Sequence, residues 1–165
     1  MRHVRTSALI ALAVAVLVPR SAYADATLFI GANTSPANRS AKGFAIGAGL
    51  LVIGFEFEYS DTTDDLASRA PALKTGMGNL LLQSPIAFAG IQPYFTIGGG
   101  VYHEDLGTNG SIADNTGFGA NTGGGLKISL LGPVRLRVDY RVFTLKNGAL
   151  TTPAHGVYAG LNLKF

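Results

Sequence analysis

The last eleven residues of the chain, 155–165, alternate strictly between two kinds of side chain. Successive side chains of an extended strand point to opposite faces, so one face carries Val157, Ala159, Leu161, Leu163 and Phe165. The opposite face carries Tyr158, Gly160, Asn162 and Lys164. An apolar face, a mixed face and a final aromatic residue are typical of the closing strand of a transmembrane β-barrel. An amphipathic strand of a soluble barrel is the alternative.

The first residues have the three parts of a secretory signal peptide. Arg2 and Arg5 make a basic start, residues 8–18 are apolar, and Ala22 and Ala24 frame a small-residue cleavage site. The apolar run is too short for a membrane-spanning helix, which needs about 20 residues. We predict a signal peptide over 1–24 and one outer-membrane barrel domain over 25–165.

Removal of this segment changes the charge of the chain. The full sequence has 13 Lys+Arg and 10 Asp+Glu, and Arg2, Arg5 and Arg20 leave with the signal peptide. The mature chain is therefore close to neutral, and its charge gives no reason to expect nucleic-acid binding. The chain has no Cys, which excludes a disulfide and a thiolate ligand or nucleophile.

The mature chain shows short segments of period 2, separated by polar or Gly-, Pro- and Asn-containing clusters, and no convincing helical period. We expect strands at 26–34, 43–50, 54–60, 75–84, 91–102, 116–130, 134–145 and 155–165. The fourth is the weakest, because residues 80–82 are all Leu. These segments predict an all-β chain: an eight-stranded antiparallel up-and-down transmembrane β-barrel.

The expected connections alternate in length. Those after the first, third, fifth and seventh segments are long and polar, whereas those after the second, fourth and sixth are short. Outer-membrane barrels have short periplasmic turns and longer outside loops. The pattern therefore places both termini in the periplasm and the loops 61–74 and 103–115 outside.

Charged residues lie on one face of two segments. Glu56 and Glu58 alternate with aromatic residues in the third segment, and Arg135, Arg137, Asp139 and Arg141 alternate with apolar residues in the seventh. The third and seventh of eight strands face each other across a barrel, and the lumen is narrow enough for side chains to fill. Buried charges must be paired. We predict a polar plug of Glu56 and Glu58 against Arg135, Arg137 and Arg141, completed by Asp139 and Lys127. A small or gated pore is the alternative.

Two further groups of residues have weaker patterns. Phe44, Tyr59, Tyr102 and Tyr140 could form an aromatic girdle at a membrane interface, or could be ordinary sheet packing. His103, Glu104 and Asp105 carry metal-ligand atoms, but one His beside two acids is a weak metal pattern, and we interpret it as a solvated loop. We expect no catalytic residue, no metal and no cofactor.

With these segments the chain resembles the small outer-membrane β-barrel superfamily of OmpA-like, OmpX-like and opacity-type surface proteins. Residues 91–102, 117–127 and 134–142 look like its fifth, sixth and seventh strands. The ending with Tyr158, Leu161, Leu163 and Phe165 looks like the signal that the barrel assembly machinery reads. Lipid A deacylase barrels have the same architecture and use a His with a nearby Ser, but here Gly156 and Val157 follow His155.

The resemblance implies location in the cell outer membrane and a structural or surface-interaction role, because members of the superfamily differ in activity and the fold does not choose among them. The expected partners are outer-membrane lipid and lipopolysaccharide, the barrel assembly machinery during biogenesis, and a host or surface ligand at the outer loops. We expect a monomer. The alternatives are a narrow porin-like channel and a soluble periplasmic lipocalin-like carrier.

Overall fold

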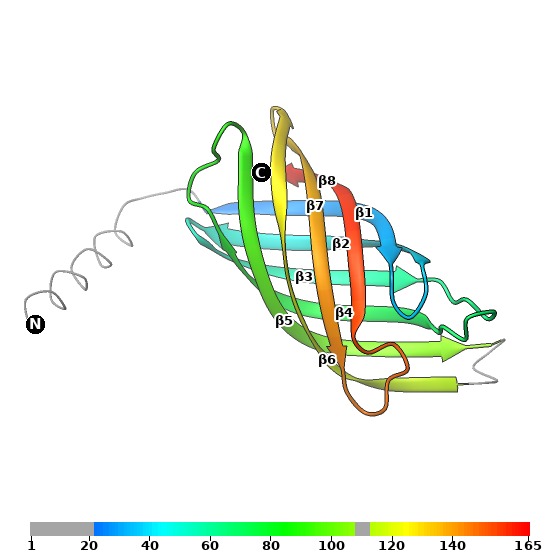
Figure 1. Ribbon diagram of the computed structural model, residues 1–165. Coiled ribbons are helices and arrows are strands. Elements are labelled where there is room, and N and C mark those ends of the chain that lie inside the picture. The colour runs from blue at the N-terminus through cyan, green and yellow to red at the C-terminus, as the bar shows by residue number, and fades with distance from the viewer. Residues whose placement is uncertain (1–21, 108–112) are drawn as a thin grey trace, which may run out of the picture.

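The computed structural model describes residues 22–107 and 113–165, which form one closed antiparallel sheet (Figure 1). Its strands are β1 (Tyr23–Asn33), β2 (Arg39–Leu50), β3 (Ile53–Thr62), β4 (Ala72–Gln83), β5 (Ile91–Leu106), β6 (Ala113–Leu131), β7 (Val134–Leu145) and β8 (Ala154–Lys164). Each strand pairs with its neighbours in sequence, and β1 pairs with β8 to close the ring. Closure removes the free edges that an open sheet would have. The predicted eight-stranded up-and-down barrel is confirmed.

In the part of the chain that the structure describes, no helix is long and apolar enough to cross a membrane.

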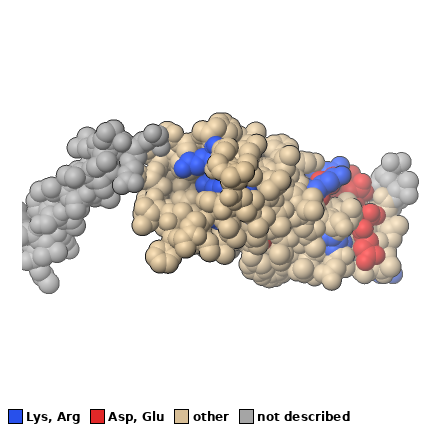
Figure 2. Space-filling view, turned by 90° about the horizontal axis from the view of Figure 1, so that it is seen from above, with Lys and Arg blue, Asp and Glu red and all other residues tan. Residues whose placement is uncertain are grey.

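The two faces of the sheet have opposite chemistry. Large apolar side chains are exposed on the outside, among them Leu28, Ile30 and Phe55, which are 72%, 72% and 68% exposed. Charged and polar side chains are buried inside, as strands with period 2 require when they close into a narrow barrel. Figure 2 shows Lys and Arg toward both ends of the face in view and Asp and Glu gathered toward one end, with a band of mostly uncharged residues between the ends.

Two of the hairpins are joined by two residues each, 51–52 between β2 and β3 and 132–133 between β6 and β7. In the second, Gly132 has a φ of +56° and is followed by Pro133. A positive φ at the first central residue is what a type II′ hairpin turn needs, and glycine adopts it without a steric penalty.

The strands extend further than the sequence predicts at the end of the barrel away from the chain termini. Because β2 begins at Arg39, β3 continues to Thr62, β4 begins at Ala72, β5 continues to Leu106 and β6 begins at Ala113, three connections shorten to 34–38, 63–71 and 107–112. The connection 146–153 has the predicted bounds. The predicted alternation of loop lengths is therefore only partly correct. The connection 84–90, expected to be short, is longer than 34–38, because the ladder of β1 and β2 continues through Asn33 and Arg39.

The predicted signal peptide lies almost wholly outside the described residues, since 1–21 are not among them. Tyr23 and Ala24 are part of β1, where they pair with Gly49 and Ala48 of β2. Cleavage after Ala24 stays a prediction, and it would shorten β1 by these two residues.

Candidate functional site

The largest group of potentially functional side chains lies inside the barrel, between β3 and β7. Glu56 and Glu58 have the same parity along β3, and Arg137, Asp139 and Arg141 have the same parity along β7, so each set points inward. β3 and β7 are four strands apart in a ring of eight. Their inward side chains therefore meet across the lumen, and all five are at most 5% exposed.

Arg137 and Arg141 are the cations of this central cluster. Both terminal nitrogens of Arg137 donate to the Glu56 carboxylate, and Nη2 lies 3.0 Å from Oε1. The Nε of Arg137 donates to Asp139 Oδ2 at 2.7 Å. Arg141 Nη2 lies 3.0 Å from Glu58 Oε2, 3.4 Å from Glu56 Oε1 and 3.5 Å from Asp139 Oδ1. A planar guanidinium suits such fork-like pairing with carboxylates. The three acids and two arginines form one connected ionic network.

Lys127 and Arg135 belong to a second cluster, nearer the chain termini. Both contact Asp25, with Lys127 Nζ at 2.7 Å and Arg135 Nη2 at 3.0 Å from Oδ2. Arg135 Nε also donates to Asn162 Oδ1 at 2.7 Å. The prediction that Arg135 pairs with Glu56 and Glu58 is therefore wrong, because the register places Arg135 opposite Asn162 of β8, which in turn pairs with Thr27 of β1, two residues from Asp25.

Asp25 is an ionic residue of these clusters that sequence reasoning missed. Leu28 and Ile30 lie on the outer face of β1, and the same alternation, continued backward, turns Asp25 inward. We interpreted Asp25 only as the start of the mature chain, although the signal for its orientation was present.

Uncharged polar side chains complete the interior. Tyr94 lies between the two clusters: its hydroxyl contacts Asp139 and accepts from Arg137 Nε at 2.8 Å, and the Arg137 guanidinium lies 5.1 Å from its ring centre. Asn121 donates to Asn79 at 2.7 Å. Inward glycines make room for these groups, since a Cβ at Gly125 would lie 2.6 Å from the Tyr94 hydroxyl. The pattern alone did not predict these partners, because each depends on the register across strands.

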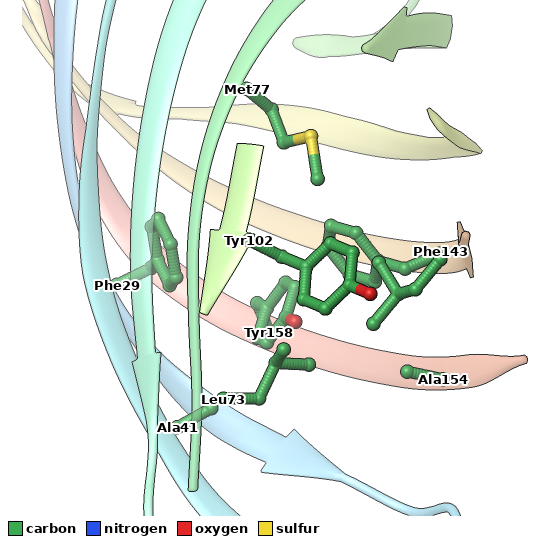
Figure 3. Close-up of a cluster of buried hydrophobic side chains, with 9 residues drawn as sticks. Phe29, Ala41, Leu73, Met77, Tyr102, Phe143, Ala154 and Tyr158 are labelled. Carbon is green, nitrogen blue, oxygen red and sulfur yellow. The ribbon is translucent and has the colours of Figure 1, made fainter. Parts of the chain in front are cut away.

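A layer of buried apolar side chains lies in the part of the lumen nearer the connections 34–38, 63–71 and 146–153 (Figure 3). Phe29 and Tyr158 pack with ring centres 5.0 Å apart, and the Tyr158 hydroxyl donates to Asn33 Oδ1 at 3.0 Å. The rest of the layer consists of Ala41, Leu73, Met77, Tyr102, Phe143, Leu145 and Ala154. The expected interface position of Tyr102 is wrong: it has the same parity along β5 as Tyr94 and Thr96, and is 1% exposed inside the barrel.

The other three aromatic residues of the expected girdle do lie on the outside. Phe44 and Tyr59 pack with ring centres 5.8 Å apart, and the Tyr140 hydroxyl hydrogen-bonds with His155 Nδ1 at 2.6 Å. This geometry allows an interfacial position but does not require one.

The two ionic clusters are together electrically balanced. Four buried carboxylates, Asp25, Glu56, Glu58 and Asp139, face four buried cations, Lys127, Arg135, Arg137 and Arg141. Every one of these eight has an opposite charge within 4.0 Å. Arg137, Arg141, Tyr102, Tyr158 and Lys127 are among the largest side chains in the barrel and are less than 2% exposed. The described interior thus contains paired charges at one level and a cluster of apolar side chains at another.

The residues of the predicted assembly signal divide between the two faces of β8. Tyr158 points inward, whereas Leu161, Leu163 and Phe165 are 57%, 49% and 74% exposed on the outside. Phe165 is tied to Ala24 by two backbone hydrogen bonds of 2.8 and 2.9 Å. Recognition by an assembly machinery stays a prediction.

His103 and Glu104 lie in β5 rather than in a loop, on opposite faces of the sheet. His103 points outward and hydrogen-bonds with Thr116 Oγ1 at 2.8 Å, while Glu104 is buried at 1% exposure. The described residues contain no group of three His, Cys, Asp or Glu that could hold a metal ion. The three neighbours in sequence therefore do not form one ligand set.

Comparison with protein-family models finds no match, and comparison with curated protein sequences also finds none. Solved structures do match. Neisserial surface protein A (NspA) is 14% identical with a TM-score of 0.63, covering 87% of this chain and 94% of that one. The N-terminal β-barrel domain of Pseudomonas aeruginosa OprF is 15% identical with a TM-score of 0.63, covering 87% and 97%.

A third match is Ail, the attachment invasion locus protein of Yersinia pestis, solved in complex with the heparin analogue sucrose octasulfate. It is 8% identical with a TM-score of 0.53, covering 89% of this chain and 100% of Ail. At these identities the likeness concerns the fold. The sheet closure, the apolar outer wall and these matches together show that the chain has the fold of the small eight-stranded β-barrels of bacterial outer membranes.

Proposed function

We propose that this protein is an integral outer-membrane barrel with a plugged lumen and a structural or surface-interaction role, and that it has no catalytic activity. The observation that carries the proposal is the division between the two faces of the sheet: apolar side chains cover the outside, and a charge-balanced network fills the inside. Lipid can solvate the first face, and only paired, hydrogen-bonded charges are tolerated in the second.

The proposed orientation has both termini in the periplasm. Two of the three connections at the end with the termini have two residues, 51–52 and 132–133. The connections 63–71 and 146–153 at the other end are longer, which supports placing that end outside. Loops on a rigid barrel are the usual place for binding, so a surface ligand would meet this end.

The narrow channel is the less favoured alternative. Ion passage needs a continuous wet path, whereas Phe29, Tyr158 and Leu73 form an apolar layer above the ionic network. The soluble carrier is disfavoured by the outer wall, because its surface would have to expose Leu28, Ile30 and Phe55 to water.

The complex of Ail with a sulfated sugar analogue suggests one class of outer ligand, but the described outer connections of this chain carry no net charge. Asp64 and Asp65 in the connection 63–71 are balanced by Arg69 in the same connection and by Lys146 in the connection 146–153. These connections therefore do not favour a sulfated polyanion. We propose a host or surface ligand at the outer connections, and outer-membrane lipid and lipopolysaccharide around the wall.

The first experiment is membrane fractionation, with gel mobility measured before and after boiling in detergent. Outer-membrane residence with a mobility shift on boiling supports the proposal. A soluble periplasmic protein without a shift would overturn it and make a small-ligand carrier the leading function.

Cysteine labelling tests the faces directly, because the natural chain has no Cys. Val138→Cys on the outer wall should react with membrane-soluble reagents and resist water-soluble ones, while Ser68→Cys in the connection 63–71 is the water-exposed control. Equal reactivity of both toward a water-soluble maleimide would contradict the membrane assignment. Planar-bilayer recordings should show no regular single-channel steps, and stable steps would favour the channel.

A further inference from the structure

Two connections at the end of the barrel opposite the start of β1 contain fully buried residues. Ala70 at the end of the connection 63–71 and Thr151 in the connection 146–153 are both 0% exposed, and Pro71 is buried too. Residues of surface loops are ordinarily exposed, because buried loop backbone must find hydrogen-bond partners. The backbone of Ala70 pairs with that of Asp65, whereas Pro71 and Thr151 bond to two buried charged side chains at the rim of the lumen, Arg39 and Glu104.

Arg39 is the first residue of β2, points inward and is 2% exposed. Its Nη1 donates to the carbonyl of Pro71, and its Nη2 donates to the carbonyl of Ser35 at 3.1 Å. Arg39 thus joins the connection 63–71 to the connection 34–38. Among the described residues no carboxylate lies within 4.0 Å of Arg39, so loop carbonyls solvate its charge.

Glu104 has the complementary role on β5. Its Oε2 accepts from the amide of Leu150 at 2.9 Å and its Oε1 accepts from the amide of Thr151 at 2.8 Å. Within the ranges that the structure describes, it too has no opposite charge within 4.0 Å. Both of its oxygens are therefore used to hold the backbone of the connection 146–153.

Ser35 links the two halves. Its hydroxyl donates to the carbonyl of Pro153 at 3.0 Å and accepts from the amide of His155 at 3.1 Å. Hydrogen bonds therefore run without a break from Pro71 through Arg39 and Ser35 to the connection 146–153, which Glu104 holds from the other side.

We propose that Arg39, Ser35 and Glu104 form a mouth clamp, which holds the connections 34–38, 63–71 and 146–153 as one fixed lid over the lumen before any partner binds. The lid closes the lumen a second time, independently of the ionic network. The contacts that define the clamp lie within this chain; only the statement that the lid faces the cell exterior rests on the proposed function.

Glu104→Gln is the primary test, because it keeps the shape of the side chain but replaces one carboxylate oxygen by an NH2 group. That group is a donor and cannot accept the hydrogen bond from the backbone amide of Leu150 or Thr151 that it faces. Backbone hydrogen exchange is measured by NMR in detergent micelles. We expect the amides of residues 150 and 151 to exchange about tenfold faster or more, with strand amides unchanged. Asp114→Asn, on the exposed outer face of β6, is the matched control and should change neither amide.

Ser35→Ala tests the link by removing a single hydroxyl, and keeps the proposal testable if Glu104→Gln fails to fold. The amide of His155 should exchange faster, whereas the exposed Ser40→Ala control should leave it unchanged. The clamp is wrong if the amides of 150 and 151 are unprotected in the natural chain, or if neither variant alters exchange. Failure of membrane fractionation would instead count against the proposed location and leave these exchange rates interpretable.

Discussion

Neutralising Glu56 is the perturbation that most directly examines the lumen. The Glu56 carboxylate accepts from both terminal nitrogens of Arg137 and lies 3.4 Å from Arg141. Glu56→Gln keeps the volume of the side chain and one acceptor oxygen, but replaces the other oxygen by an NH2 group, a donor that faces the donors of the Arg137 guanidinium. The two ionic clusters then have four cations and three carboxylates, so one positive charge is left without a counter-charge.

The size of the effect follows from burial. Glu56 and Arg137 have side chains that are each 1% exposed, so little water can screen the lost pair. Removing one partner of a buried ion pair costs about 3–5 kcal/mol, a large part of the roughly 5–15 kcal/mol that stabilises a typical domain. The remaining contacts of Arg137 and Arg141 with Asp139 place the expected loss near the lower end of that range.

Denaturant unfolding in detergent, followed by the mobility shift on boiling, measures this loss. The control is Asp114→Asn, whose side chain is 65% exposed and whose removal should cost only about 0–1 kcal/mol. The double variant Glu56→Gln with Glu58→Gln should be less stable than either single variant. Equal unfolding midpoints for Glu56→Gln and Asp114→Asn would refute the reasoning, because the network would then be solvated or unformed.

Three other perturbations probe the wall, the interior spacing and one loop. Phe57→Arg on the outer wall should cost about 2–4 kcal/mol of stability in a bilayer if residue 57 lies near the bilayer midplane. Leu66→Arg in the connection 63–71 is the control and should cost little. Equal unfolding free energies for the two variants would contradict the membrane-facing assignment of Phe57. Gly123→Val should prevent formation of the boiling-sensitive compact form, because a Cβ there lies 2.1 Å from the Tyr140 carbonyl oxygen and 2.8 Å from Arg141 Cδ; a normal mobility shift would count against this register. Hydrogen bonds from Ser68 and from the amide of Ala67 lower the pKa of Asp65 in the folded protein. The stabilisation of the loop by Asp65 is therefore fully present above the pKa of Asp65 in the unfolded chain, and it is lost as the pH falls through the lower pKa of the folded protein. An Asp65 carboxyl carbon that titrates at or above the ordinary Asp range by NMR would disprove this.

Much of the barrel could be predicted from alternation alone. The inward direction of Glu56, Glu58 and Arg137 follows from their parity, because a strand has only two faces. Residues 80–82 appeared ambiguous in the sequence, and the register resolves them: Leu81 is buried inside, and Leu82 is 48% exposed outside.

Partner choice within the lumen could not be predicted in the same way. Which acid meets which base depends on the stagger between strands, which local periodicity does not encode. Arg135 therefore received the wrong partner, and Asp25 was overlooked. Arg39 and Glu104 were placed in connections because polar residues at strand ends read as loop, whereas both lie in strands.

The seam between β1 and β8 makes assembly of this fold an all-or-none event. β1 pairs with β2 on one side and with β8 on the other, so its second row of hydrogen bonds waits for the strand that is synthesised last. A chain that stops after β7 would leave two open edges, and unsatisfied backbone groups at a lipid-exposed edge cost several kcal/mol each. Closure of the ring, and with it the pairing of every strand on both sides, therefore depends on the eleven residues of β8.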